Sequence, residues 1–257
     1  MDAPAAAKKA RINRFLPYWA VFQADMHQTL RSWVYRTWVL VSVAAAVGYL
    51  LYHVGIYQKA GIIQPASTLI SELLRWTVLG SVTLIVALTA GSISSERGTM
   101  ADSVLSRGIS RYQYFMGKWH ARLATILGTY FVMTLLAVAG GFFLLHEDLK
   151  WTGSLMALAT VGAILAAVVS CGVAVSAMVN SSIFGIAILW FALYGAGFAL
   201  SLLPARVPSP DRLLAQLPDV LRGYYNLHTL GRLIGWAAIA SCGTAFVGLA
   251  YFARRDV

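Results

Sequence analysis

The sequence predicts an all-α, polytopic membrane protein with six membrane-spanning helices. The 257 residues are 59% hydrophobic, and only 12% are charged, about half of the roughly 25% found in soluble domains. Long uncharged stretches recur along the chain, as bilayer crossings require. This composition excludes a water-soluble globule and a disordered chain. The two cysteines, Cys171 and Cys242, are too few for a disulfide scaffold.

The six spans follow from windows without Asp, Glu, Lys or Arg. Crossing about 30 Å of hydrocarbon takes about 20 apolar residues, and five windows are that long. The window 151–205 is long enough for two crossings, with a turn and a helix cap predicted at Asn180-Ser181-Ser182. We therefore expect spans near Trp38–Tyr57, Leu69–Ile93, Leu123–Leu145, Leu155–Met178, Ile183–Leu203 and Leu233–Phe252.

The distribution of Lys and Arg predicts the orientation, because these residues are retained in short cytoplasmic loops. Six spans place both termini on one side, and the segments of that side hold 13 basic residues against seven on the other. Both termini are therefore expected in the cytoplasm of a bacterium, with the protein in its inner membrane. The net charge of +10 is then a topology signal, and no nucleic-acid partner is expected. The first apolar stretch begins too late for a cleaved signal peptide.

The chain divides into a cytoplasmic segment, 1–36, and a transmembrane domain, 37–257. Within the domain we expect a cytoplasmic loop, 94–122, and an external loop, 204–232. Four prolines punctuate the external loop, and its leucines Leu213, Leu214 and Leu217 need cover. A periplasmic protein docking there is one source of that cover.

The segment before the first span contains apolar residues at every third or fourth position, which predicts one stripe of a helix. The stripe comprises Phe15, Trp19, Phe22, Met26, Leu30 and Trp33. Such an amphipathic helix suits the membrane interface, where lipid would cover the stripe. The alternative is that the stripe packs against the protein's own spans.

The loop between the second and third spans has the pattern most typical of a functional site. Two capping-box patterns predict helix starts there, Thr99 with Asp102 and Ser110 with Gln113. Between them we expect a helix of about eight residues, roughly 12 Å long. Its apolar side chains are Met100, Val104 and Leu105. Because so short a helix is unstable alone, a partner protein is expected to hold it; a solvated connecting loop is the alternative.

Polar residues within the spans have two interpretations. Glu72 and Arg75, three residues apart near the outer end of the second span, are either a self-paired interfacial couple or a pair that lines a pathway. Hydroxyl residues four apart either face a polar route or bond their own backbone; they are Thr77, Ser81, Thr125 and Thr129. No charged residue is expected deep in a span.

Short stretches of the loop and of the tail resemble a known family. They are Glu96-Arg97-Gly98-Thr99, Leu105-Ser106-Arg107, Ile109-Ser110-Arg111, Gly117-Lys118 and Phe252-Ala253-Arg254-Arg255-Asp256. These stretches resemble the cytoplasmic loop and the ending of the type-2 ABC transporter permeases, in particular their NosY-like subgroup. The number of spans, the amphipathic N-terminal helix and the length agree over nearly the whole chain. Gly108 departs from the pattern, because relatives usually carry proline there.

The resemblance implies the membrane subunit of an ABC exporter. The loop helix would be a coupling helix that docks into a separate ATPase subunit, and the segment 15–36 would be an interfacial elbow helix. The coupling residues would be Glu96, Arg97, Gly98, Thr99, Met100, Asp102, Val104, Leu105, Ser106, Arg107 and Gly108. Glu96 and Arg97 would pair with charges of the ATPase or anchor the interface. Six spans make half a transporter, so a second copy or a paralogue is implied, and the driven motion would export a substrate or move a periplasmic accessory protein.

Catalytic motifs are missing from the sequence. A P-loop ends in Gly-Lys-Ser/Thr, whereas Gly117-Lys118 is followed by Trp119. ATP and Mg are therefore expected in the partner, with no cofactor in this chain. The sequence contains no Ser-Gly pair that would frame a serine nucleophile, no His-Glu-x-x-His, and no metal-ligand spacing of His or Cys. We expect a non-catalytic subunit without a metal; an intramembrane enzyme such as a protease is the alternative class.

Overall fold

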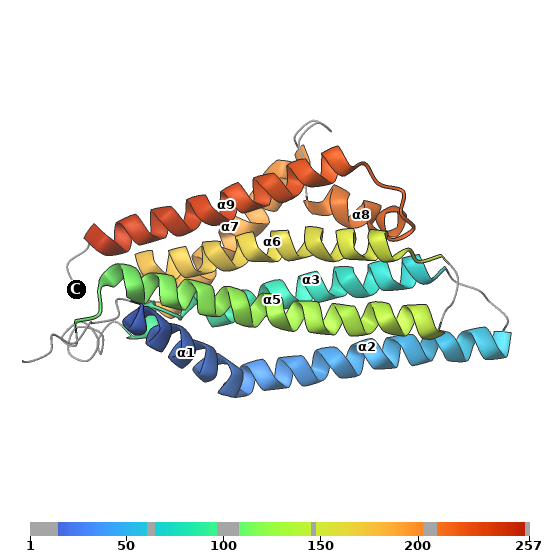
Figure 1. The fold of residues 1–257 in the computed structure, drawn as a ribbon, viewed down its shortest axis with the longest axis horizontal. Coiled ribbons are helices and arrows are strands. Elements are labelled where there is room, and N and C mark those ends of the chain that lie inside the picture. Colours follow the sequence, from blue (N-terminus) through green and yellow to red (C-terminus); the bar gives the residue numbers. More distant parts are fainter. Residues whose placement is uncertain (1–14, 61–64, 97–107, 145–147, 203–209, 255–257) are drawn as a thin grey trace, which may run out of the picture.

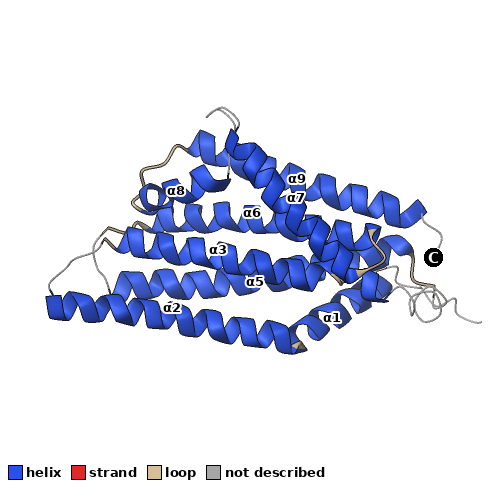
Figure 2. Ribbon diagram, turned by 180° about the vertical axis from the view of Figure 1, so that it is seen from behind, coloured by secondary structure: helices blue, strands red, loops and turns tan. Residues whose placement is uncertain are grey.

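The computed structural model describes residues 15–60, 65–96, 108–144, 148–202 and 210–254. Every regular element in these ranges is helical (Figure 2), which confirms the predicted all-α class for this part of the chain. In chain order the elements are α1 (Leu16–Arg31), α2 (Trp33–Ala60), α3 (Ala66–Ala90), the 3-10 turn η1 (Ser94–Glu96), α5 (Arg111–Leu144), α6 (Trp151–Met178), α7 (Ser182–Leu202), α8 (Pro210–Leu221) and α9 (Leu227–Arg254).

The six predicted spans correspond to six helices that are long and apolar enough to cross a membrane: α2, α3, α5, α6, α7 and α9. Large apolar side chains cover their outer surfaces. Phe191 of α7, for example, is 83% exposed, and Ile183 is 81% exposed. Apolar surface on this scale suits lipid and is unusual for a monomer in water. The fold is therefore that of a polytopic membrane protein.

The third span begins earlier than the sequence suggests. The apolar stretch starts near Leu123, but α5 begins at Arg111, so the second half of the expected 94–122 loop is helical. The predicted Ser110–Gln113 capping box is the reason. The Ser110 backbone N–H donates to Gln113 Oε1 (3.0 Å), and the Gln113 N–H donates to Ser110 Oγ (3.2 Å). Gly108 has φ +77°, which proline, fixed near −65°, does not adopt.

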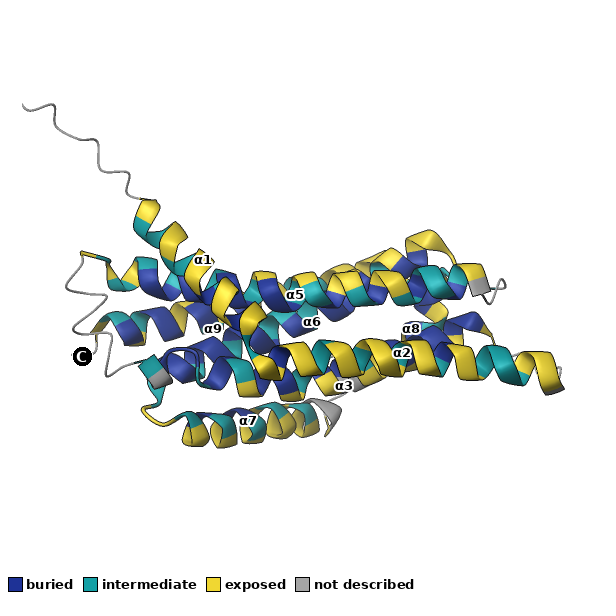
Figure 3. Cartoon of the chain, turned by 90° about the horizontal axis from the view of Figure 1, so that it is seen from below, coloured by how far each residue is buried: buried dark blue, intermediate teal, exposed yellow. Residues whose placement is uncertain are grey.

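Helix α6 forms the centre of the bundle (Figures 1 and 3). In its most apolar window 61% of the residues are buried, against 6% for α2 and 11% for α7, which lie at the edges. Small residues let α9 approach α6 closely. A Cβ added at Gly248 would lie 2.8 Å from Ala174 Cα. Gly248 of α9 therefore packs directly against α6.

The long helices run along one another, so the bundle has two ends (Figure 1). The α1 end contains α1, η1, the start of α5 and the end of α9. The α8 end contains α8, the start of α3 and the start of α6. α1 and the end of α9 therefore share an end.

The expected external loop, 204–232, contains α8 and the start of α9. Leu217 and Leu221 of α8 are fully buried, so the bundle itself covers Leu217. Leu214 packs partly against the same core, and the side chain of Leu213 lies outside the description. Asp148, before α6, accepts hydrogen bonds from the Ser67 hydroxyl (2.6 Å) and from Arg222 Nε (2.8 Å). This cluster holds α3, α6 and α8 together.

Candidate functional site

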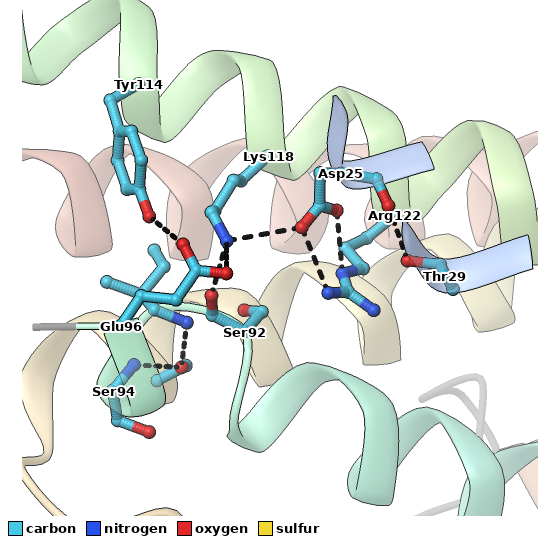
Figure 4. A network of polar contacts seen from close by, with 10 residues as sticks. Asp25, Thr29, Ser92, Ser94, Glu96, Tyr114, Lys118 and Arg122 are labelled. Atoms are coloured by element: carbon cyan, nitrogen blue, oxygen red, sulfur yellow. Dashed lines mark hydrogen bonds and ion pairs between the residues drawn. The ribbon is translucent and has the colours of Figure 1, made fainter. Parts of the chain in front are cut away.

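A cluster of buried charges joins α1 to α5 at the α1 end (Figure 4). The Asp25 carboxylate of α1 lies 3.2 Å from Lys118 Nζ and 2.9 Å from Arg122 Nε. Arg122 Nη2 also donates to Asp25 Oδ1 over 3.0 Å. The three residues are 3%, 3% and 7% exposed. Buried charges of this kind persist only when paired, so α1 is fixed to α5 at this point.

Glu96 extends the cluster to η1. Lys118 Nζ lies 2.8 Å from Glu96 Oε1, and the Tyr114 hydroxyl donates to Glu96 Oε2 over 2.7 Å. Burial alone would raise the pKa of the Glu96 carboxyl, but the charge of Lys118 and the two hydrogen bonds outweigh burial and lower that pKa below its ordinary value. Glu96 is therefore ionised near neutral pH, and two acidic residues balance two basic ones. We call Asp25, Glu96, Tyr114, Lys118 and Arg122 the charge cluster.

Helix α6 also fixes η1, the short helical turn that contains Glu96. Ser176 Oγ accepts hydrogen bonds from the backbone N–H groups of Ile93 (2.9 Å) and Ser94 (3.2 Å). Lys118 Nζ donates to the Ser92 carbonyl over 2.7 Å. Backbone groups after the end of α3 are thereby satisfied. The chain thus enters residues 97–107 from a position that α1, α5 and α6 all determine.

Close packing between α1 and α5 supports the charge cluster. A Cβ added at Gly117 of α5 would lie 2.9 Å from Val21 Cβ and 3.2 Å from the Tyr18 carbonyl oxygen. One turn further along, the Tyr18 hydroxyl and His120 Nδ1 are 3.1 Å apart. Glycine at 117 therefore lets the two helices approach closely enough for Asp25 to reach both cations.

The structure describes only part of the predicted coupling segment. Glu96 is in the charge cluster and Gly108 begins the turn before α5. The others lie outside the described residues: Arg97, Gly98, Thr99, Met100, Asp102, Val104, Leu105, Ser106 and Arg107.

The predicted N-terminal helix is present as α1, but it ends at Arg31 rather than continuing to residue 36. Ser32, with ψ 132°, interrupts it before α2 begins. Four of the six stripe residues are exposed: Phe15, Trp19, Leu30 and Trp33. Phe22 and Met26 are half-buried. Most of the stripe therefore faces away from the bundle, and what covers it stays a prediction.

The predicted pathway residues do not converge on one site. Glu72 accepts a hydrogen bond from the Tyr49 hydroxyl of α2, and the ion pairs of the described residues do not include Glu72 with Arg75. The self-paired interpretation is therefore wrong for this structure. Because α3 begins at Ala66, Glu72 and Arg75 lie about 9 and 14 Å along it from its first residue.

The hydroxyl residues divide into two kinds. Thr77 and Thr129 donate to carbonyl oxygens one turn earlier, over 2.7 Å each, as the backbone-bonded alternative predicts. Thr129 also hydrogen bonds to the Tyr35 hydroxyl of α2. Ser81 and Thr125 have buried hydroxyl oxygens without a hydrogen-bond partner in the described part of the structure.

Sequence reasoning missed most of the charge cluster. The sequence places Lys118 and Arg122 among the basic residues of the cytoplasmic side, and Asp25 lies outside the apolar stripe of the N-terminal helix, but no pattern joins the three. A signal was present, because Lys118 and Arg122 are four residues apart and share one face of a helix. Asp25, the acidic residue of the predicted helix, was the corresponding partner. What the sequence did not show is that this polar side faces inward.

Comparison with protein-family models finds no match, and no curated protein matches the chain. Among the described residues, His, Cys, Asp and Glu do not gather in groups of three or more that would hold a metal ion. The described part of the chain is thus all-helical, with six helices long and apolar enough to span a membrane and a turn before residue 97 that the charge cluster fixes.

Proposed function

We propose that this chain is the membrane subunit of an ABC transporter, an exporter driven by a separate ATPase subunit. The observation that carries the proposal is the charge cluster, which ties α1 and α5 to Glu96, the first residue of the expected coupling segment. A segment that receives force must be attached to elements that move with it. Residues 97–107 follow Glu96 directly in the sequence, so a force on them would pass to the charge cluster and from there to α1 and α5.

The proposed mechanism starts at residues 97–107, where the ATPase would dock on the side chains of Val104 and Leu105. ATP binding would draw two ATPases together, and the displacement would pass through Glu96 and Lys118 into α5. Packed helices transmit such displacements as rigid bodies. The spans of two facing copies, or of this chain and a paralogue, would then open alternately to each side.

The orientation expected from the basic residues supports the same assignment. Basic residues are concentrated in segments that adjoin the α1 end, which the positive-inside rule places in the cytoplasm. An ATPase that uses cytoplasmic ATP would meet residues 97–107 on that side. In a variant of the mechanism, the same motion would act on a periplasmic protein at the α8 end, where the clamp of Asp148 and Arg222 fixes α8 to the spans.

Capture of the ATPase tests this proposal. Tagged chain is purified in mild detergent from its host, and the co-purifying proteins are assayed for ATP hydrolysis. We expect an ABC ATPase with the unmodified chain, and a loss of at least about tenfold when Val104 and Leu105 are both replaced by Asp, because charged groups would be buried unpaired in the docking groove. Lys59→Glu at the α8 end is the matched control and should leave capture unchanged.

Two results would reject the proposal. One is the absence of any ATPase in preparations of the unmodified chain. The other is full capture by the Val104→Asp, Leu105→Asp variant. An intramembrane enzyme would instead show activity from this chain alone, and that activity would disappear on replacement of one Ser or His.

A further inference from the structure

Helix α3 is one of the six membrane-length helices, and one of its faces is exposed. Its residues recur at three- or four-residue spacing, and we call them the α3 face: Thr68, Glu72, Arg75, Trp76, Gly80, Thr83 and Ala87. Helix α3 lies between α2 and α7 and contacts both (Figure 3). The α3 face is therefore flanked by two exposed helices.

The α3 face differs in composition from the surfaces beside it. The exposed side chains of α7 include Ile183, Phe191 and Phe198, and those of α2 include Leu40 and Leu51. Such residues are suited to lipid. Among the residues of the α3 face whose exposure the structure describes, Trp76 is the large apolar one; the others are small, hydroxylated or charged. Lipid is a poor neighbour for this composition, because charges within a span usually face protein or a water-filled cavity.

The two charges of the α3 face do not satisfy each other within one copy. Glu72 accepts a hydrogen bond from Tyr49, and Arg75 is in none of the ion pairs of the described residues. Both side chains are exposed. One acid and one base three residues apart form a surface that is complementary to itself under twofold rotation.

We propose that a second copy of this chain covers the α3 face, and that Arg75 of each copy pairs with Glu72 of the other. A twofold axis along the membrane normal keeps both copies in the same orientation. Glu72 of one copy then differs in height from Arg75 of the other by only about 4.5 Å, three residues of helix rise. Side chains of this length span that offset. The inference deepens the proposed function, on which it rests for the expectation of two facing halves.

The two reciprocal pairs would close the space between the copies near the α8 end. They lie about 9 to 14 Å along α3 from that end. Gly80, Thr83 and Ala87, further toward the α1 end, would leave that space less filled. The interface would thus have a charged contact on one side and small side chains on the other.

Charge reversal in two differently tagged, co-expressed copies tests the proposal without any ATPase. One tag is captured in detergent and the other is measured by blot. Glu72→Arg expressed with itself, and Arg75→Glu expressed with itself, should each reduce capture at least about tenfold, since like charges would face each other. Glu72→Arg expressed with Arg75→Glu should restore capture, because both reciprocal pairs are then opposite in sign.

Restoration in the mixed pair separates the interface from a folding defect, since each chain keeps the substitution that it carried alone. The double variant Glu72→Arg, Arg75→Glu should also self-associate, and Lys59→Glu is a charge reversal outside the face that should change nothing. The inference would be overturned if either single variant self-associated as well as the unmodified chain, which is the result expected if Arg75 reaches lipid headgroups instead. It would also be overturned if the mixed pair failed to restore capture. Copies that pair while no ATPase is captured would contradict the proposed function alone.

Discussion

Asp25 of α1 and Lys118 of α5 form an ion pair of 3.2 Å in which both side chains are almost completely buried. They are 93 residues apart in the sequence. The pair converts an amphipathic surface helix into a fixed part of the bundle. Glu96 pairs with Lys118 and Arg122 pairs with Asp25, so that two acids balance two bases. The loss of any one charge therefore leaves an unmatched charge in a buried position.

Replacement of Asp25 by Asn should therefore destabilise the protein strongly. Arg122 would remain buried without its counter-charge and Lys118 would keep only Glu96, at a cost of about 3–5 kcal/mol. Denaturant titration of the detergent-purified protein gives the free energy of unfolding and so measures the loss of stability. Gln23→Ala, on the exposed side of α1, is the control and should have little effect. Equal stability of the two variants would show that the cluster does not hold α1.

Replacement of Gly117 by Leu should push α1 away from α5. The new side chain would overlap Val21 and the Tyr18 carbonyl, and overpacking of this kind typically costs about 1–3 kcal/mol. Gly128→Leu is the matched control, because a Cβ at Gly128 of the same helix meets nothing within 4 Å. Proteolysis between Arg31 and Trp33 should become faster in the Gly117 variant only. Identical cleavage rates in both variants would argue against close α1–α5 packing.

Acidification should weaken the charge cluster through Glu96. Its pKa in the folded protein lies below the ordinary value of 4.5, so its contribution to stability is complete above pH 4.5 and is lost as the pH falls through the lowered pKa. Stability measured against pH should therefore fall in this acidic range, and Glu96→Gln should flatten part of the fall. Asp148, whose pKa is also lowered although burial opposes this, titrates at the other end of the bundle. The variant Asp148→Asn shows how much of the fall in stability comes from Asp148. A stability profile of Glu96→Gln against pH that equals that of the unmodified protein would contradict the assignment of the fall to Glu96.

Replacement of Gly153 by Ala should detach α8 from α6. A Cβ at this position would lie 2.8 Å from the Leu221 carbonyl oxygen, which also accepts a hydrogen bond from the Lys150 N–H. Trypsin cleavage at Arg212 should accelerate at least several-fold, since cleavage follows local opening. Gly235→Ala, with nothing within 4 Å of the added Cβ, should cleave at the normal rate. Cleavage of the Gly153 variant at that same rate would show that α8 is not clamped.

The sequence predicts the fold because bilayer crossing constrains composition so strongly. Windows without charge identify all six long helices, and the Ser110–Gln113 capping box is present as expected. The helix ends were harder to predict, since α5 and α9 extend well beyond their apolar stretches. Hydrophobicity reports where lipid lies, whereas capping and packing decide where a helix begins.

The charge cluster was not predictable from periodicity alone. Asp25 lies beside the apolar stripe on the helical wheel, and a charged side chain there ordinarily faces water. Only the tertiary arrangement, with Gly117 admitting α1 and with Lys118 and Arg122 inside, turns this side inward. For the same reason the sequence offers Arg75, three residues away, as one partner for Glu72, whereas the Tyr49 hydroxyl of another helix donates a hydrogen bond to Glu72.

ATP turnover by the reconstituted assembly tests the central claim most directly. The chain and its captured ATPase are placed in lipid vesicles, and hydrolysis is measured for the unmodified chain, for Asp25→Asn and for the Val104→Asp, Leu105→Asp variant. The account predicts ATP hydrolysis with the unmodified chain, loss of the assembly and its hydrolysis with the double variant, and reduced hydrolysis in an intact assembly with Asp25→Asn. Hydrolysis that is the same with all three chains would contradict it.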